Sequence, residues 1–263
     1  MKQTILTAKQ SQLLENLIIK YNRVVTTRQI YEQAENNWHY QQTKKLIARL
    51  VDNGWLIRIK RGLYAISNFS NRGFLSLSPY VVANLLVKNS YVSFGAALTY
   101  HGMFDQLTDI LYSISKIQYK PVKLDSTEYN FIKVKDDFFF GWEKAEIDNQ
   151  SAQIATAEKA LIDMIQFHRS QHAVDLVIEK LMAYRSTLNI NQIYRDLSHM
   201  SIVTIKIFGL IFDLLQINTA PLRKLVKTKQ STHWMMAGDK KFNAKWRLYY
   251  DPYFDQYKPQ STP

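Results

Sequence analysis

The sequence contains no cysteine and no long apolar run. Without cysteine the chain can form neither disulfides nor thiolate zinc sites, so we expect packing alone to hold the fold, in a reducing cytoplasm. The most apolar run, at residues 205–215, includes Lys206 and Asp213 and is far shorter than the roughly 20 residues that span a bilayer. The first segment, MKQTILTAKQ, lacks the apolar centre of a signal peptide. We therefore expect a cytoplasmic protein without a membrane span.

Signatures of catalysis are missing as well. Residues 93–103, SFGAALTYHGM, match neither a phosphate loop nor a dinucleotide fingerprint, and the chain has no nucleophile elbow and no zinc-protease motif. His168 and His172 have the i, i+4 spacing of a metal pair, but no acid lies between them and no third ligand is near. Glu158 and Asp163 lie five apart, so they diverge on a helix. We expect a non-enzymatic protein without metal or cofactor.

Positive charge is concentrated near the N-terminus. The formal net charge is +12, of which residues 1–72 carry +8 and the much longer remainder only +4. This concentration favours a polyanionic partner, because cations that neutralise phosphates release counterions and so gain affinity. With 263 residues, 46% of them hydrophobic, the chain can bury a substantial core and is long enough for two domains.

Residues 26–66 have the pattern of a winged helix-turn-helix. A first helix at residues 7–21, capped by Thr7, and a second at residues 28–34, capped by Thr26 or Thr27, precede the helix that would read DNA. That third helix is amphipathic, with an apolar stripe formed by Thr43, Leu46, Ile47, Leu50 and Val51. After Gly54, alternating residues predict a hairpin that turns at Arg61 and Gly62.

The opposite face of the third helix and the hairpin carry side chains suited to DNA. Arg and Lys can form paired hydrogen bonds with guanine, Gln can do so with adenine, and an α-helix fits the major groove. Some winged helices bind only proteins, which is the alternative interpretation. The candidate DNA-binding residues are Thr27, Arg28, Gln41, Gln42, Lys44, Lys45, Arg49, Arg58, Lys60 and Arg61.

The rest of the chain predicts an α+β domain. Residues 67–78, rich in Asn, Ser and Gly, predict a linker, so we place the winged helix at residues 1–70 and the second domain at residues 74–263. Within the stretch ATAEKALIDMI, Thr156 can cap a helix, and Lys159 and Asp163 have ion-pair spacing. Helices are predicted at residues 80–87, 92–101, 157–167, 172–185, 191–199 and 201–215, and strands at 110–120, 129–140, around 234 and at 246–250.

A second group of cations lies near the C-terminus, with Asp239 the one acid among them. This group is either a solvated surface or a second contact for nucleic acid or an acidic partner. Trp234 and Trp246 in the same region could stack on a ligand or belong to the core, which is commoner. The eight cations are Arg223, Lys224, Lys227, Lys229, Lys240, Lys241, Lys245 and Arg247.

Four stretches together resemble the AbiEi-family antitoxins, the transcriptional regulators of type IV toxin-antitoxin systems that act in abortive infection and phage defence. They are NGWLIRIKRGLYAI at residues 53–66, YVSFGAALTYHGM at 91–103, FIKVKDDFFFGWEK at 131–144 and AQIATAEKALIDMI at 152–165. Each is weakly specific alone, but their order and spacing extend the resemblance from about residue 7 to about residue 250.

The resemblance implies that the first domain binds inverted repeats in the double-stranded promoter DNA of its own operon and represses it, with self-association on DNA. The second domain would neutralise a cognate nucleotidyltransferase-like toxin, directly or through a shared target. Two rivals stay open. One is a plain regulator whose second domain senses a ligand or oligomerises. The other is a nucleic-acid-processing enzyme, which would need Asp163, Glu158, Asp136 or Asp137 to meet in one pocket with a lysine and a metal.

Overall fold

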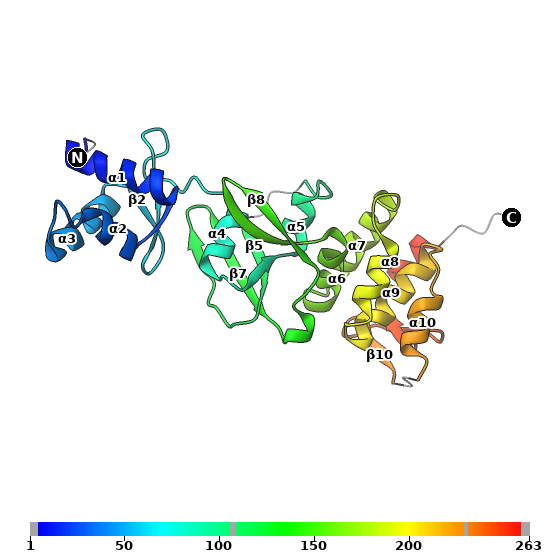
Figure 1. The fold of residues 1–263 in the computed structure, drawn as a ribbon. Helices are drawn as coiled ribbons and strands as arrows, with labels where there is room; N and C mark the ends of the chain where they lie inside the picture. Colours follow the sequence, from blue (N-terminus) through cyan, green and yellow to red (C-terminus); the bar gives the residue numbers. More distant parts are fainter. Residues whose placement is uncertain (1–4, 106–108, 229–230, 259–263) are drawn as a thin grey trace. The chain divides into compact units, whose positions relative to one another are not determined.

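The computed structural model describes residues 5–105, 109–228 and 231–258 (Figure 1). The chain forms two compact units. The N-terminal unit consists of residues 1–88 together with the short segments 121–129 and 146–152, and the C-terminal unit contains the other residues. Within the described part of the chain, no helix is both long enough and apolar enough to cross a membrane.

The N-terminal unit begins with a winged helix-turn-helix, as predicted. Its elements are α1 (Ala8–Tyr21), β1 (Val24–Thr26), α2 (Thr27–Ala34), α3 (Tyr40–Asp52), β2 (Leu56–Lys60) and β3 (Leu63–Ile66). The three strands form an antiparallel sheet in the order β1-β3-β2. One core joins the helices to the wing; among its residues are Leu17, Ile30, Leu46, Trp55 and Tyr64.

Short local signals fix where these elements begin and end. Thr7 caps α1 in a capping box with Gln10, and Thr26, rather than Thr27, caps α2 in the same way with Gln29. Gly54, with φ of +77°, ends α3 in a left-handed conformation that side chains disfavour. A Cβ at Gly54 would lie 2.9 Å from the Cα of Gly73, so this position also admits a close approach of two backbones.

The segment after the wing packs against it. The backbone N–H of Ser67 donates to the carbonyl of Trp55 at 3.0 Å, and that of Gly73 donates to the carbonyl of Gly54 at 3.0 Å. Ser78 then caps α4 (Pro79–Leu86), whose proline occupies the first turn. The domain boundary near residue 70 stays a prediction.

A six-stranded sheet follows, in the order β6-β7-β5-β4-β9-β8. β4 pairs antiparallel with β5 and parallel with β9. The predicted strand at 129–140 is wrong in its second half, because a 3-10 turn at Asp136–Phe138 interrupts it. The elements are β4 (Ser90–Val92), α5 (Phe94–Tyr100), β5 (Ile110–Ser115), β6 (Val122–Leu124), β7 (Thr127–Lys133), β8 (Trp142–Ile147) and β9 (Gln150–Ala155).

Helices make up most of the remaining chain (Figure 1). α6 contacts α5, α7, α8 and α9, and each residue from Lys159 to Ile165 is buried. α9 is also central, with every residue from Thr204 to Phe212 buried. The helices are α6 (Ala157–Phe167), α7 (Gln171–Ala183), α8 (Ile190–Leu197), α9 (Ile202–Leu214) and α10 (Ala220–Val226), of which α10 was not predicted.

The chain ends in a small sheet of three short strands. β10 (His233–Trp234), β11 (Lys241–Asn243) and β12 (Leu248–Tyr250) lie in the order β10-β12-β11, and a 3-10 helix (Pro252–Tyr257) follows. Trp246, just before β12, packs on α9 where Gly209 leaves room for it: a Cβ at Gly209 would lie 2.5 Å from its ring. The indole N–H of Trp246 donates to Asp213 at 2.6 Å. The small sheet is thereby attached to the central helix.

Candidate functional site

The third helix, α3, has one buried and one exposed face. Thr43, Leu46, Ile47 and Leu50 are buried, as the periodicity predicted. Gln41, Lys44, Lys45 and Arg49 are all exposed and form no ion pair with another described residue. Four of the predicted contacts therefore share one helix and face solvent.

Three other predicted contacts near the helices already have partners in the protein. Gln42 is exposed, but its side-chain oxygen accepts a hydrogen bond from the backbone N–H of His39 at 3.0 Å, at the start of α3. Arg28 forms an exposed ion pair with Glu32 at 2.9 Å. The backbone N–H of Thr27 donates to the carbonyl of Gly62 in the turn of the wing at 2.9 Å. Thr27 and Gln42 thus hold the motif together.

The three cations of the wing differ in their surroundings. Arg61, at the tip, is exposed and makes no ion pair with another described residue. Arg58 is exposed, with its guanidinium 5.8 Å from the centre of the Tyr64 ring. Lys60 is half-buried, and its ammonium donates to the backbone carbonyl of Leu86 at the end of α4, at 3.0 Å. Arg61 is the cation most available to a phosphate.

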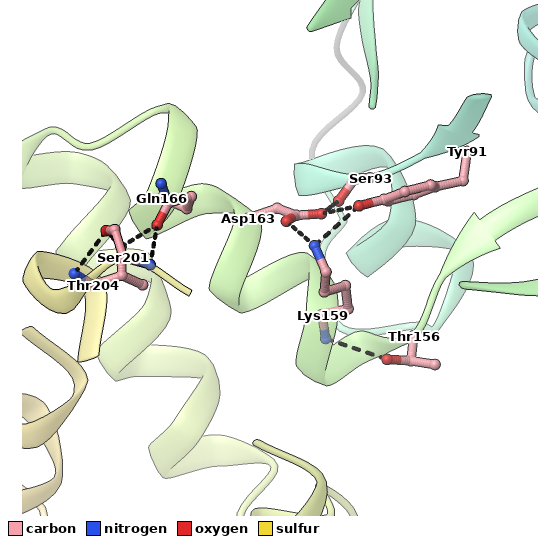
Figure 2. A network of polar contacts seen from close by, with 8 residues as sticks. All are labelled: Tyr91, Ser93, Thr156, Lys159, Asp163, Gln166, Ser201 and Thr204. Carbon is pink, nitrogen blue, oxygen red and sulfur yellow. Dashed lines mark hydrogen bonds and ion pairs between the residues drawn. The ribbon is translucent and has the colours of Figure 1, made fainter. Parts of the chain in front are cut away.

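A buried polar network surrounds the predicted Lys159–Asp163 pair (Figure 2). The two side chains form an ion pair and both are fully buried. The hydroxyls of Ser93 and Tyr91 donate to the same carboxylate at 2.7 and 3.2 Å, and Lys159 also donates to the hydroxyl of Tyr91 at 3.0 Å. Burial raises the pKa of Asp163 above its ordinary value, and the charge of Lys159 and the hydrogen bonds from Lys159, Ser93 and Tyr91 lower it only in part. Both oxygens of the carboxylate thus have a donor.

Neighbouring residues complete the enclosure of Lys159. Its ammonium lies 4.8 Å from the centre of the Phe140 ring. A Cβ at Gly141, whose φ is +72°, would lie 2.8 Å from the Cγ of Lys159, so glycine makes room for the lysine stem. As predicted, Thr156 caps α6 and accepts from the backbone N–H of Lys159. At the far end of α6, Gln166 accepts from Thr204 of α9 at 2.6 Å (Figure 2).

The acids that the enzyme hypothesis requires do not gather around this lysine. Glu158 accepts instead from the backbone N–H of Asn189 at 2.8 Å, and Asp136 pairs with Lys116 at 3.0 Å. His168 stacks on Phe94 with ring centres 4.5 Å apart. Over residues 5–105, 109–228 and 231–258, no three His, Asp or Glu side chains lie close enough to hold a metal ion. We interpret the network as structural, because its hydrogen bonds hold α6 against β4.

Five of the predicted C-terminal cations line one hollow of about 400 Å³. They are Arg223, Lys224, Lys227, Lys245 and Arg247. Lys206 joins them from α9; it is buried and donates to the carbonyl of Ser231 and to Nδ1 of His233. Burial lowers the pKa of Lys206, and the charge of Arg247 lowers it further. The hollow is a site of concentrated positive charge.

The acids near this hollow neutralise only part of it. Lys245 pairs with Asp213, whereas no described acid pairs with Arg223, Lys224 or Lys227. Among the other predicted cations, Lys241 pairs with Asp255, Lys240 is exposed and does not line the hollow, and Lys229 lies outside the described residues.

Comparison with known proteins gives one match to a family. Residues 12–67, which include α2, α3 and the wing, match the family model described as the AbiEi antitoxin transcriptional regulator. The resemblance to the AbiEi antitoxins is confirmed for these residues. The match is confined to residues 12–67, which we call the AbiEi-like domain, and no curated protein matches the chain.

The fold of the whole chain is also found in a solved structure. The RV2827C protein from Mycobacterium tuberculosis has a TM-score of 0.67 to it at 13% sequence identity, over 95% of this chain and 93% of that one. At this identity the likeness concerns the fold alone. It does include both the AbiEi-like domain and the α+β part.

Sequence reasoning missed two features of the site. The Lys159–Asp163 spacing predicted an ion pair, but Tyr91 and Ser93, about 70 residues earlier in the chain, gave no local signal of its burial. Trp246 belongs to the core, which is the commoner location for tryptophan, whereas Trp234 is exposed. Trp246 is buried because it packs against Gly209 of α9, a contact that is visible only in the folded chain.

Replacing Arg61 or Lys60 of the AbiEi-like domain with alanine should have different effects. We expect Arg61→Ala to weaken DNA binding and lower the slope of log affinity against log salt by about one, because one phosphate contact is lost. Lys60→Ala should mainly lower the melting temperature, since its hydrogen bond to Leu86 is lost. Binding across a salt series and thermal unfolding measure both effects. Equal salt slopes for the two variants would contradict this assignment.

Removing one member of the buried pair should strongly destabilise the C-terminal unit. We expect Lys159→Met to cost about 3–5 kcal/mol in the free energy of unfolding, because Asp163 is left charged and buried. The double variant Lys159→Met/Asp163→Leu should recover part of this loss. The control is Asp136→Asn, which breaks an exposed pair and should cost about 1 kcal/mol or less. Urea unfolding measures all three, and equal losses for the single variant and the control would contradict a buried pair.

Asp255 should make stability depend on pH. Partial burial alone would raise its pKa, but hydrogen bonds from Lys241, Lys258 and Tyr250 lower it to about 2. The stabilisation is therefore present above the unfolded-state pKa of 3.8 and is lost as the pH falls through about 2. We expect Asp255→Asn to be less stable than the parent at pH 7 and to approach it near pH 2. A difference in unfolding free energy that does not change with pH would contradict this.

Proposed function

We propose that the chain is a DNA-binding antitoxin that represses its own toxin-antitoxin operon. The observation that carries this is the row of exposed side chains on α3 inside an AbiEi-like domain. The 13 residues of α3 extend over about 20 Å, enough to lie along a major groove. Gln41, Lys45 and Arg49 would read base edges from this helix.

Other cations supply affinity that does not depend on sequence. Lys44 on α3 and Arg58 and Arg61 on the wing are exposed and can neutralise phosphates on either side of the groove. Two copies, one on each arm of an inverted repeat, would raise the modest affinity of a single domain. Lys60, Gln42 and Thr27 would contribute less directly, because they stabilise the motif.

The antitoxin role is assigned to the α+β part of the chain, at residues 74–263. The description of the matching family as an antitoxin supports it, and the cognate partner would be a nucleotidyltransferase-like toxin. The α+β part could neutralise the toxin either by direct contact or by acting on a shared target. Growth of cells that express a candidate nucleotidyltransferase-like toxin, with and without this chain, tests the role; no rescue would favour a plain transcriptional regulator.

Replacing Lys45 and Arg49 together tests the DNA-reading face. We expect Lys45→Ala/Arg49→Ala to weaken binding to the DNA upstream of the gene by at least about tenfold and to reduce its salt dependence, because base and phosphate contacts are lost. The matched control is Lys133→Ala/Lys144→Ala, which removes the same charge from exposed positions of the α+β part. Titration against scrambled DNA of equal length gives selectivity. If both double variants bind like the parent, α3 does not read DNA.

A further inference from the structure

The small C-terminal sheet carries a row of three aromatic rings. Tyr249 on β12 lies opposite Trp234 on β10 and opposite Phe242 on β11. The rings of Trp234 and Tyr249 are stacked, with centres 5.1 Å apart and an angle of 11° between their planes. The ring of Phe242 lies 5.0 Å from that of Tyr249. One aromatic side chain from each strand thus forms a continuous row across the sheet.

This row is on the solvent side of the sheet. Trp234 is 52% exposed and Phe242 is 45% exposed, whereas Leu248 and Tyr250, the neighbours of Tyr249 along β12, are buried. Side chains alternate between the two faces of a strand, so the inner face of β12 fills the core and the outer face carries Tyr249. Large exposed rings that contribute little to a core indicate a binding surface.

Positive charge lies directly beside the row. Arg247 immediately precedes β12, and its guanidinium donates to the hydroxyl of Thr232, next to β10, at 3.4 Å. Arg247 also lines the cationic hollow together with Arg223, Lys224 and Lys227. In the part of the chain that the structure describes, no acidic side chain pairs with these last three. Arg247, two residues before Tyr249 in the chain, therefore connects the aromatic row to the cations of the hollow.

We propose that this surface binds single-stranded nucleic acid, with bases stacked on Trp234, Tyr249 and Phe242 and phosphates held in the cationic hollow. Exposed rings on a small sheet, beside a basic groove, are what unpaired bases and their backbone require. A duplex would use the cations but not the rings, since the faces of its bases are covered. RNA loops and ends are the usual source of such unpaired bases.

This surface and the proposed DNA-reading face of α3 belong to different units of the chain. The aromatic row and the hollow belong to the C-terminal unit, and α3 belongs to the N-terminal unit. The inference does not rest on promoter binding, and either could fail without the other. The experiment therefore uses the full chain carrying Lys45→Ala/Arg49→Ala, in which binding through α3 is weakened and binding through the sheet is not.

Fluorescence anisotropy with a labelled 12-nucleotide uridine strand tests the proposal. We expect the parent of this series to bind the strand in a salt-dependent way, and Trp234→Ala and Phe242→Ala each to weaken binding by about tenfold, as the loss of one stacked base implies. Trp234→Phe should retain most of the affinity, because it keeps a ring face. Phe74→Ala, an exposed aromatic of the N-terminal unit, is the control and should change nothing.

The outcomes separate the proposal from its rivals. Equal binding of a thymidine strand supports it, because stacking and phosphate contacts do not require the 2′-hydroxyl. Equal fold-losses of strand binding and of 12-base-pair duplex binding in Trp234→Ala would overturn it, because the ring would then not be stacking on unpaired bases. Equal losses for Trp234→Phe and Trp234→Ala would also overturn it, because a retained ring face would then not preserve binding. No loss for either ring would overturn it as well, since binding would then be merely electrostatic. Unchanged melting temperatures of the ring variants ensure that lost binding is not lost folding.

Discussion

The buried contact between Lys159 and Asp163 is the interaction on which the α+β part depends most. Two opposite charges out of water are stable only when each has further partners, and here Tyr91, Ser93 and the Phe140 ring supply them. Tyr91 lies on β4, Ser93 directly follows β4, and Phe140 precedes β8, so a pair within one helix connects that helix to the sheet. Because α6 also contacts α7, α8 and α9, this network positions the helix against which those three helices pack.

The parts of the fold that could be predicted from sequence are those governed by local periodicity. α3 and α6 were predicted with nearly their observed ends, since apolar residues recur at helical spacing and Gly54 and Thr156 mark the boundaries. The short strands β1, β4 and β11 were missed, because three residues carry no recognisable period. β8 and β9 were missed as well; they are polar, and β9 pairs with β4 through Val92 and Ile154, over 60 residues apart.

The same division applies to the candidate site: its local features could be predicted from sequence and its long-range contacts could not. The exposed row on α3 follows from amphipathicity alone, so residues such as Lys45 and Arg49 were found directly. The sequence could not show that Lys60 donates to Leu86, because that contact depends on where α4 begins and ends. Nor could it show that Trp234, Tyr249 and Phe242 meet, since their register combines a parallel and an antiparallel strand pair. Long-range pairing, rather than residue type, decides which side chains become a surface.

The close packing of Gly209 against Trp246 connects the interior of the C-terminal unit to its electrostatics. Asp213 lies one helical turn beyond Gly209 on α9 and accepts both from the indole of Trp246 and from Lys245 at the rim of the cationic hollow. Any side chain larger than hydrogen at residue 209 would displace the indole and disturb the carboxylate that it binds. The charge balance of the hollow is therefore set partly by an uncharged residue in the core, so a survey of surface charges alone would misjudge which positions control it.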